Sequence, residues 1–498
     1  MPDGYLRVSP RPIFLSNYTI LQVAIYRWRR HALCSDQPLS AGAPASLKVS
    51  WARAHLALIL IIIVVVGAAA GGGTYYVLSM NRGSTIFFYE SLAPPEVDFF
   101  QHQLVPQFEA ANPGTNVILV NLSGPDDTAS VVEALVKGNS VGPSLVGIDN
   151  LVVGEVIYAN AVTDLTPMLS DIEPSSLITS AQKMIAYEQQ VYGGATYFVP
   201  FRSNVPLVWY NITAFTKAGI NSPPANTTQL LADAAKLKTA GYSTPIMFQG
   251  GGRDASAATE LYQWMVQFGG NPFMFNDTGD VATFQYLQTL SQYFNPGYIN
   301  GYWGEYTGLY SGSYQLLDYQ WPYIYSQLTN ATYKMTDQNL GVYPGPAGPS
   351  NSNHVLGGDV LVIPKGATNL PLVEKFAKFL LDSQAQTQTL LKLAWVAVNS
   401  AAYNNLPGNF STVGNALLSA IDQGVFLRNP APWISTWDAQ IYDAWTQIVE
   451  ASPQPSPSQV HTILNTENQQ LYNYLVTNYG TQTAQQYEQN AFKPISVS

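Results

Sequence analysis

Tryptophans and tyrosines in this sequence have the types and spacing that suit binding of sugars. Flat rings stack on the apolar C–H face of a pyranose, while carboxylates and amides hydrogen-bond to its hydroxyl groups. Residues 301–325 are dense in such rings, and Trp303, Trp321 and Tyr323 in this segment are candidate stacking platforms, as is Trp395. Aromatic side chains lie more often in a core than against a ligand, so packing is the alternative role for each.

Two carboxylates are expected where strands end. Glu90 and Asp149 close short apolar runs that suit buried strands, and in layered α/β domains ligands bind beyond the carboxyl ends of such strands. Both are therefore candidates for binding sugar hydroxyl groups, with capping of a following helix as the alternative. A hydrolase with this carboxylate pair about 5–9 Å apart is a further, less favoured, alternative.

Two further motifs of catalytic and phosphate-binding sites are absent from the sequence. It contains no His-Glu-x-x-His and no phosphate-binding Gly-x-x-x-x-Gly-Lys-Ser/Thr motif. His102, His354 and His461 are far apart and lack metal-ligand spacing, and Cys34 is the one cysteine. We therefore expect a protein that is not an enzyme and that needs no metal or cofactor.

Charge is scarce and unevenly distributed. Residues 1–83 hold 8 of the 22 Lys and Arg residues and 2 of the 32 Asp and Glu residues, which leaves 14 basic and 30 acidic groups, a formal −16, in the remainder. A surface of that sign argues against nucleic acid as a partner. Because only 11% of residues are charged, the surface must consist mainly of uncharged polar side chains, and we expect it to suit an acidic exterior.

A membrane anchor is expected at residues 56–78, which are 23 residues without a charge. As a helix they would span roughly 34 Å, enough for a hydrocarbon core of about 30 Å. Basic residues precede this run, so the positive-inside rule places residues 1–55 in the cytoplasm, without expected order, and the rest outside the cell. A cleaved signal peptide is the alternative. Six Asn-x-Ser/Thr motifs in the exterior part are candidate glycosylation sites: Asn121, Asn211, Asn226, Asn276, Asn330 and Asn409.

Strands alternate with helices after residue 84. The pattern predicts strands at 85–90, 117–122 and 144–148, and helices at 95–111, 128–137 and 151–159. This alternation is typical of an α/β domain with a largely parallel sheet. The stretch 197–220 then combines two prolines with an apolar, aromatic run, which indicates extended chain that leaves one compact unit and enters another.

Several motifs carry a family resemblance. They are G-x-x-Y-x-x-P at 194–200, Y-N-x-x-x-F-x-K-A-G at 210–219, F-E-x-x-N-P-G at 108–114 and V-T-D-L-T-P at 162–167. Over roughly residues 84–475 the chain resembles the family 1 extracellular solute-binding proteins, the maltose-binding-protein-like receptors of ABC importers. The resemblance implies a two-lobed periplasmic-binding-protein-like α/β fold (type II), with lobe 1 formed by 84–200 plus 340–402, lobe 2 by 201–339 plus 403–475, and 476–498 as a tail.

The same resemblance implies further site residues. The Q-W-P sequence at 320–322 matches a segment that faces the cleft in the family, which favours Trp321 and Tyr323 as ligand contacts. Gly358 matches a glycine pair that approaches the ligand, although Asp359 replaces the aromatic residue often found next. Trp433 and Trp437 fall where relatives place another platform.

The expected function is an anchored receptor that delivers a sugar to an ABC transporter permease. A receptor for iron or a polyamine is the alternative. Arg202 lies at the crossing between the lobes, where it could brace the hinge or bind an acidic ligand; bracing is favoured, because an anion site usually needs more than one converging base.

Overall fold

The structure, a computed structural model, describes residues 84–124, 127–172, 174–404, 411–489 and 491–497. The predicted anchor at 56–78, the segment before it and the glycosylation candidate Asn409 lie outside these residues. Among the described helices, none combines the length and apolar character needed to cross a membrane.

The first lobe is built on a five-stranded sheet in the order β2-β1-β3-β11-β4. β1 runs parallel to both β2 and β3, whereas β11 is antiparallel to β3 and β4. The strands are β1 (Thr85–Glu90), β2 (Asn116–Asn121), β3 (Ser144–Asp149), β4 (Val199–Pro200) and β11 (Asp359–Val362). The predicted alternation of strands and helices is therefore present.

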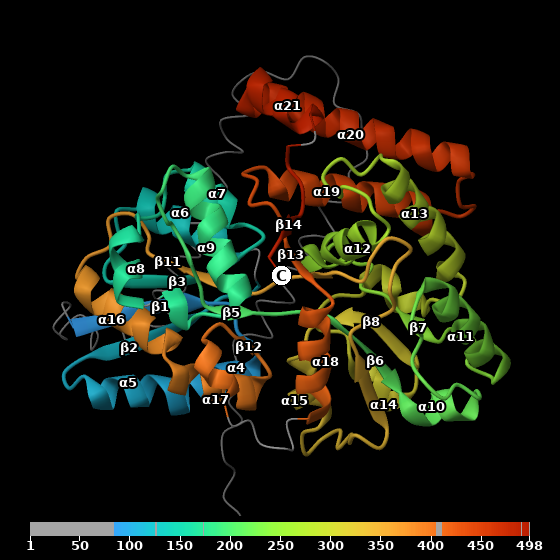
Figure 1. Ribbon diagram of the computed structural model, residues 1–498, viewed down its shortest axis with the longest axis horizontal. Coiled ribbons are helices and arrows are strands. Elements are labelled where there is room, and N and C mark those ends of the chain that lie inside the picture. The colour runs from blue at the N-terminus through green and yellow to red at the C-terminus, as the bar shows by residue number, and fades with distance from the viewer. Residues whose placement is uncertain (1–83, 125–126, 173, 405–410, 490, 498) are drawn as a thin grey trace, which may run out of the picture. The chain divides into compact units, whose positions relative to one another are not determined.

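Helices cover this sheet because their apolar residues recur at helical spacing. Val373, Phe376, Ala377 and Leu380 of α16 are buried together, and the Phe376 ring meets that of Phe88 on β1 at 5.5 Å. In Figure 1 the orange α16 and α17 lie beside the blue N-terminal elements, so distant segments share one core. The helices are α4 (Pro94–Phe99), α5 (Val105–Ala111), α6 (Asp127–Lys137), α7 (Val153–Tyr158), α8 (Thr166–Ile172), α9 (Thr179–Val191), α16 (Leu370–Leu381) and α17 (Ser383–Leu393), with a π-helical turn (Phe100–Leu104) joining α4 to α5.

The second lobe contains a four-stranded sheet in the order β7-β8-β6-β9 and a three-stranded sheet in the order β10-β13-β14. The strands are β6 (Leu207–Asn211), β7 (Ile246–Met247), β8 (Leu316–Gln320), β9 (Leu340–Tyr343), β10 (His354–Val355), β13 (Val425–Leu427) and β14 (Ile495–Ser496). The red C-terminal helices α19 and α20 lie with the green α12 and α13 in Figure 1.

Several helices of the second lobe begin at a residue that caps them. Asn211 caps α10, Asn226 caps α11 and Asp277 caps α13, each by accepting a backbone N–H of the first turn. The helices are α10 (Ile212–Lys217), α11 (Thr227–Thr239), α12 (Ser256–Gln267), α13 (Thr278–Ser291), α14 (Thr307–Ser311), α15 (Ile324–Leu328), α18 (Ser411–Asp422), α19 (Ile434–Trp445), α20 (Pro457–Tyr479) and α21 (Thr481–Glu488).

Three extended segments connect the lobes side by side. β5 (Arg202–Ser203) pairs antiparallel with β12 (Val396–Ala397). The backbones of Asn204 and Gly357 exchange hydrogen bonds of 3.0 and 2.8 Å. The chain therefore passes from the first lobe to the second through residues 202–204, just after Phe201, which still packs in the first-lobe core.

Two of the expected lobe boundaries are wrong. β9 pairs with β6, so residues 340–343 belong to the second lobe, and the chain returns to the first lobe only at 356–359. Residues 476–497 are not a separate tail, because β14 pairs with β13 and Tyr487 and Val497 are buried in the second lobe. An apolar strand such as Leu-Gly-Val-Tyr carries no signal for which of two sheets it joins.

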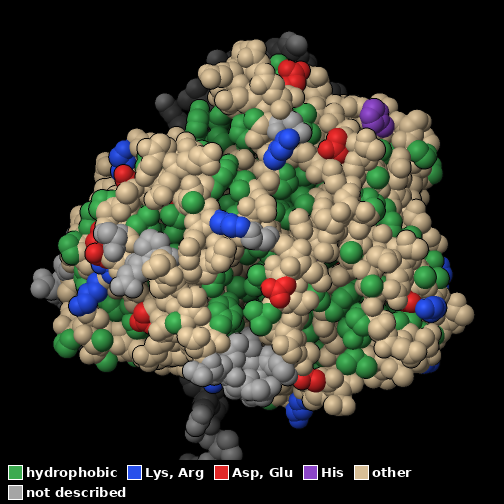
Figure 2. All heavy atoms as spheres, viewed as in Figure 1, with side chains coloured by type: hydrophobic (Ala, Val, Ile, Leu, Met, Phe, Trp, Pro, Cys, Tyr) green, Lys and Arg blue, Asp and Glu red, His purple; other side chains and the backbone are tan. Residues whose placement is uncertain are grey.

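The surface is largely polar without charge. Figure 2 shows one face on which Lys, Arg, Asp and Glu side chains are few, some of them side by side, among hydrophobic side chains, other side chains and the backbone. This agrees with a charged content of 11%.

Candidate ligand-binding cleft

A cavity of about 150 Å³ lies where the connecting segments meet both lobes. Six of the predicted ligand-binding residues line it, namely Asp149, Trp303, Trp321, Tyr323, Gly358 and Asp359. The remaining lining residues are Ser91, Ala93, Glu96, Leu151, Arg202, Asn204, Thr259 and Arg428.

Aromatic rings of the second lobe form one wall of the cavity. The rings of Trp303 and Trp321 meet nearly edge to face, with centroids 5.4 Å apart, and both side chains are partly exposed. The Trp303 indole donates to the carbonyl of Asp254 at 2.9 Å, and the Tyr323 hydroxyl donates to the carbonyl of Trp303. A Cβ at Gly357 would lie 2.5 Å from the Trp321 ring, so the glycine lets this ring lie against the connecting segment. The wall is therefore held in place before any ligand arrives.

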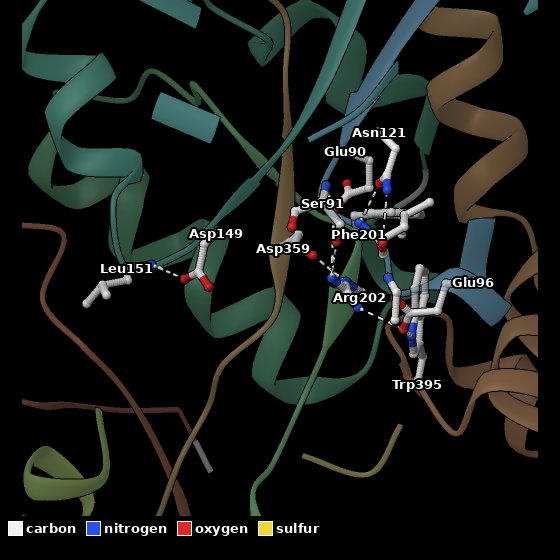
Figure 3. A network of polar contacts seen from close by, with 12 residues as sticks. Glu90, Ser91, Glu96, Asn121, Asp149, Leu151, Phe201, Arg202, Asp359 and Trp395 are labelled. Carbon is white, nitrogen blue, oxygen red and sulfur yellow. Dashed lines mark hydrogen bonds and ion pairs between the residues drawn. The ribbon is translucent and has the colours of Figure 1, made fainter. Parts of the chain in front are cut away.

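Arg202 is the centre of a polar network on the first-lobe side (Figure 3). Its guanidinium pairs with Asp359, lies 3.5 Å from Glu96 and 3.7 Å from Glu90, and stacks over the Trp395 ring at 4.2 Å. Burial lowers the pKa of Arg202, but the neighbouring carboxylates more than offset this and raise it above its ordinary value. With all these partners, Arg202 fixes β5 to the first lobe, as its position at the crossing suggested.

Glu90 belongs to this network and not to the wall of the cavity. Its side chain is fully buried. Burial is the largest cause that raises the pKa of Glu90 well above its ordinary value, and the negative charge of the neighbouring Asp359 raises it further. Because Glu90 cannot reach the cavity, the Glu90–Asp149 pair does not have the exposed arrangement that a glycosidase requires.

Asp149 and Arg428 form a second polar group, between the lobes. Arg428 follows β13 and donates to Asn150 at 3.0 Å and to Thr259 at 2.8 Å, and its Nη2 lies 3.4 Å from Asp149 Oδ1. That Asp149 oxygen also accepts the Leu151 N–H at 2.7 Å. The Asp149 side chain is 24% exposed, and no described residue donates to its Oδ2. Asp149 therefore presents an acceptor to the cavity.

Three predicted platforms do not line the cavity. Trp395 lies beneath Arg202 and donates to Glu96 at 2.6 Å, while Trp433 and Trp437 pack around Phe273 in the second-lobe core. All three tryptophans are at most 1% exposed. Their positions fit the packing role and contradict the expectation that they contact a ligand.

Sequence reasoning missed Glu96 and Arg428. Glu96 is in the first turn of α4, where its side chain accepts the Ala93 N–H at 2.7 Å and so reads as an ordinary cap. The scarcity of arginine could have drawn attention to Arg428, because only three arginines follow residue 83: Arg202, Arg253 and Arg428. Two of these three line the cavity.

The arrangement favours a neutral ligand. The guanidinium groups of Arg202 and Arg428 are already bonded to carboxylates and neutral acceptors, so an anion would have to displace those partners. Glu96 and Asp359 are 7% and 6% exposed in their side chains, which leaves Asp149 as the most accessible of the carboxylates. Rings that can stack, beside one accessible carboxylate, suit hydroxyl-bearing ligands.

Comparison with known proteins identifies the family. Residues 93–387, more than half of the chain, match the family described as bacterial extracellular solute-binding protein. The chain belongs to that family. Binding proteins of Brucella abortus and Brucella suis are 47% identical to it over 51 residues, which is 12% of their length and 10% of this chain.

Solved structures show the same two-lobed, periplasmic-binding-protein-like α/β fold. Maltose-bound MalE3 of T. maritima has a TM-score of 0.66 at 17% identity, covering 78% of this chain and 99% of its own. The GacH receptor of Streptomyces glaucescens, solved unliganded and with acarbose, has a TM-score of 0.65 at 20% identity, with coverages of 79% and 98%. The ABC substrate-binding protein Lmo0181 of Listeria monocytogenes, in complex with cycloalternan, has a TM-score of 0.64 at 16% identity, with coverages of 79% and 99%.

Proposed function

We propose that this chain is an extracellular receptor that binds a neutral mono- or oligosaccharide in the cleft between its lobes and delivers it to an ABC transporter permease. The observation that carries the proposal is the cavity itself, where the partly exposed rings of Trp321 and Trp303 face the accessible carboxylate of Asp149. The similarity to structures that hold maltose, acarbose and cycloalternan supports the sugar assignment.

Sugar is preferred to the two alternatives on the chemistry of the cleft. A polyamine needs several exposed carboxylates, whereas Glu90, Glu96 and Asp359 are nearly or fully buried around Arg202. Iron needs several converging ligands, and within the described residues no group of three or more His, Cys, Asp or Glu side chains gathers as a metal site.

We further propose that residues 56–78 tether the receptor beside its permease, and that some of the exterior sequons carry glycans. A tether raises the effective concentration of the receptor at the transporter. Asn330 is exposed and therefore accessible for modification, whereas the amide nitrogen of the exposed Asn121 donates to the Leu92 carbonyl at 3.1 Å.

The test is a titration of tryptophan fluorescence in the full chain with neutral sugars, glucuronic acid, spermidine and ferric citrate. We expect saturable binding of a neutral sugar, and a loss of on the order of ten-fold in affinity in Trp321→Ala, because the stacking contact is removed. Tyr310→Ala is the control, since this exposed ring lies outside the cleft. A response to spermidine or ferric citrate alone would overturn the sugar assignment.

A further inference from the structure

Arg428 connects cleft residues of opposite lobes. Asp149 is the last residue of β3 in the first lobe and Asn150 follows it, whereas Thr259 lies on α12 in the second lobe. Arg428 is 2% exposed and donates to all three through its two terminal nitrogens. One side chain therefore fixes the position of the carboxylate in one lobe relative to a helix in the other.

The first-lobe end of this connection is itself held by the connecting segments. The Asn150 N–H donates to the Gly358 carbonyl at 3.0 Å, and the Asn150 amide donates to the Leu356 carbonyl at 3.0 Å. Asn150 is 3% exposed. The contact of Arg428 with Asn150 thus ties β13 to the segment along which the chain returns to the first lobe.

The charge of Asp149 depends on groups from several elements. On the first-lobe side, Asp359 on β11 repels its negative charge and Arg202 on β5 attracts it. Burial raises the pKa of Asp149, and Arg428 is the strongest of the groups that lower it. On the second-lobe side, Tyr262 and Asp438 face Arg428 in turn.

We propose that Arg428 is a positioning residue for ligand binding: it keeps Asp149 ionised, with Oδ2 toward the cleft, and thereby sets the acidic pH at which sugar affinity is lost. This inference rests on the proposed sugar-binding function. An ionised carboxylate accepts hydrogen bonds from two sugar hydroxyls, whereas a protonated one gives up an acceptor and its ion pair with Arg428. Affinity therefore falls as the pH drops through the titration of Asp149.

The experiment measures sugar affinity of the full chain from pH 3.5 to 8 in the wild type, Arg428→Met, Arg428→Lys and Asp149→Asn. In Arg428→Met we expect the acid midpoint of binding to move up by about one pH unit, because a neighbouring opposite charge lowers a carboxyl pKa by about that much or more. Arg428→Lys keeps the charge and is expected to keep the acid midpoint near that of the wild type, with weaker affinity. Asp149→Asn is expected to bind weakly without this acid transition. Lys378→Met is the matched control, since Lys378 pairs with the exposed Asp171 outside the cleft.

A purely structural role for Arg428 predicts a different result. Arg428→Met and Arg428→Lys would then weaken binding equally at every pH, with the acid midpoint of the wild type, and this would overturn the inference. Carboxyl NMR of ¹³C-aspartate-labelled protein without sugar, assigned with Asp149→Asn, reads the Asp149 titration directly. If no sugar binds but this titration moves upward in Arg428→Met, the sugar assignment fails while the pairing of Arg428 with Asp149 is supported.

Discussion

Replacing Glu188 by glutamine tests whether ionisation of one buried carboxyl makes the free energy of unfolding fall as the pH rises. Glu188 lies on α9, is 1% exposed, and accepts the backbone N–H groups of Tyr197 and Phe198 just before β4. Burial raises its pKa from 4.5 to about 8, opposed by the two N–H donors, with a small further rise from Asp164. Glutamine keeps the accepting oxygen and the shape of the protonated acid.

The sign and size of this pH dependence follow from the difference between the pKa of Glu188 in the folded chain and its pKa in the unfolded chain. The unfolded chain releases the Glu188 proton near pH 4.5, whereas the folded chain keeps it up to about pH 8. The resulting stability is complete below pH 4.5 and is lost as the pH rises to about 8. At about 1.4 kcal/mol per pKa unit, the loss is at most about 5 kcal/mol. This is an upper bound, because a folded protein relaxes around an ionised carboxyl.

Urea unfolding of the wild type and Glu188→Gln at pH 4.5, 6.5 and 8.5, followed by tryptophan fluorescence, measures the effect. We expect similar stability at the lowest pH and a growing advantage of Glu188→Gln as the pH rises. Glu488→Gln, which changes an exposed glutamate on α21, serves as the control. If wild type and Glu188→Gln lose stability in parallel across this range, the argument from burial is refuted.

Two further perturbations test the network and the C-terminal segment. Arg202→Met is expected to lower the free energy of unfolding by about 3–5 kcal/mol, because it leaves buried carboxylates without their counter-charge. In urea unfolding, the double variant with Asp359→Asn should recover part of this loss. An unchanged urea midpoint in Arg202→Met alone would contradict the bracing role of Arg202. Deletion of residues 491–498 removes β14 and the buried Val497. We therefore expect the free energy of unfolding to fall by at least about 2 kcal/mol in the same assay. We also expect weaker sugar binding, because β14 pairs with β13, the strand that precedes Arg428. Wild-type stability after this deletion would show that the pairing of β14 with β13 contributes little.

The first lobe was predictable because its local signals agree with one another. Strands at 85–90 and 144–148 are apolar runs bounded by helical patterns, and both occur in the structure as β1 and β3 with closely similar bounds. A crossing near Pro200 could also be predicted, because proline within a sheet is confined to edge strands and strand ends, and Pro200 ends the edge strand β4. These features depend on residues close together in the sequence.

The features that sequence reasoning missed depend on distant partners. β9 joins β6 and not the first lobe, although its residues would suit either sheet. The residues next to Trp433 and Trp437 in the sequence do not distinguish a core ring from a ligand-stacking ring. Both rings are buried because they pack against Phe273, which is distant in the sequence. Arg428 acquires its role only when β13 brings it to Asp149, a residue 279 positions away.

The placement of β14 has a consequence for how the protein is made. Strands β1 to β4 and β11 have all been synthesised once the ribosome has passed residue 362, so the sheet of the first lobe can assemble while translation continues. The small sheet that carries Arg428 gains its edge strand only after residues 495–496 have emerged. A nascent chain therefore acquires half of its cleft early and its complete cleft only when these last strand residues are released.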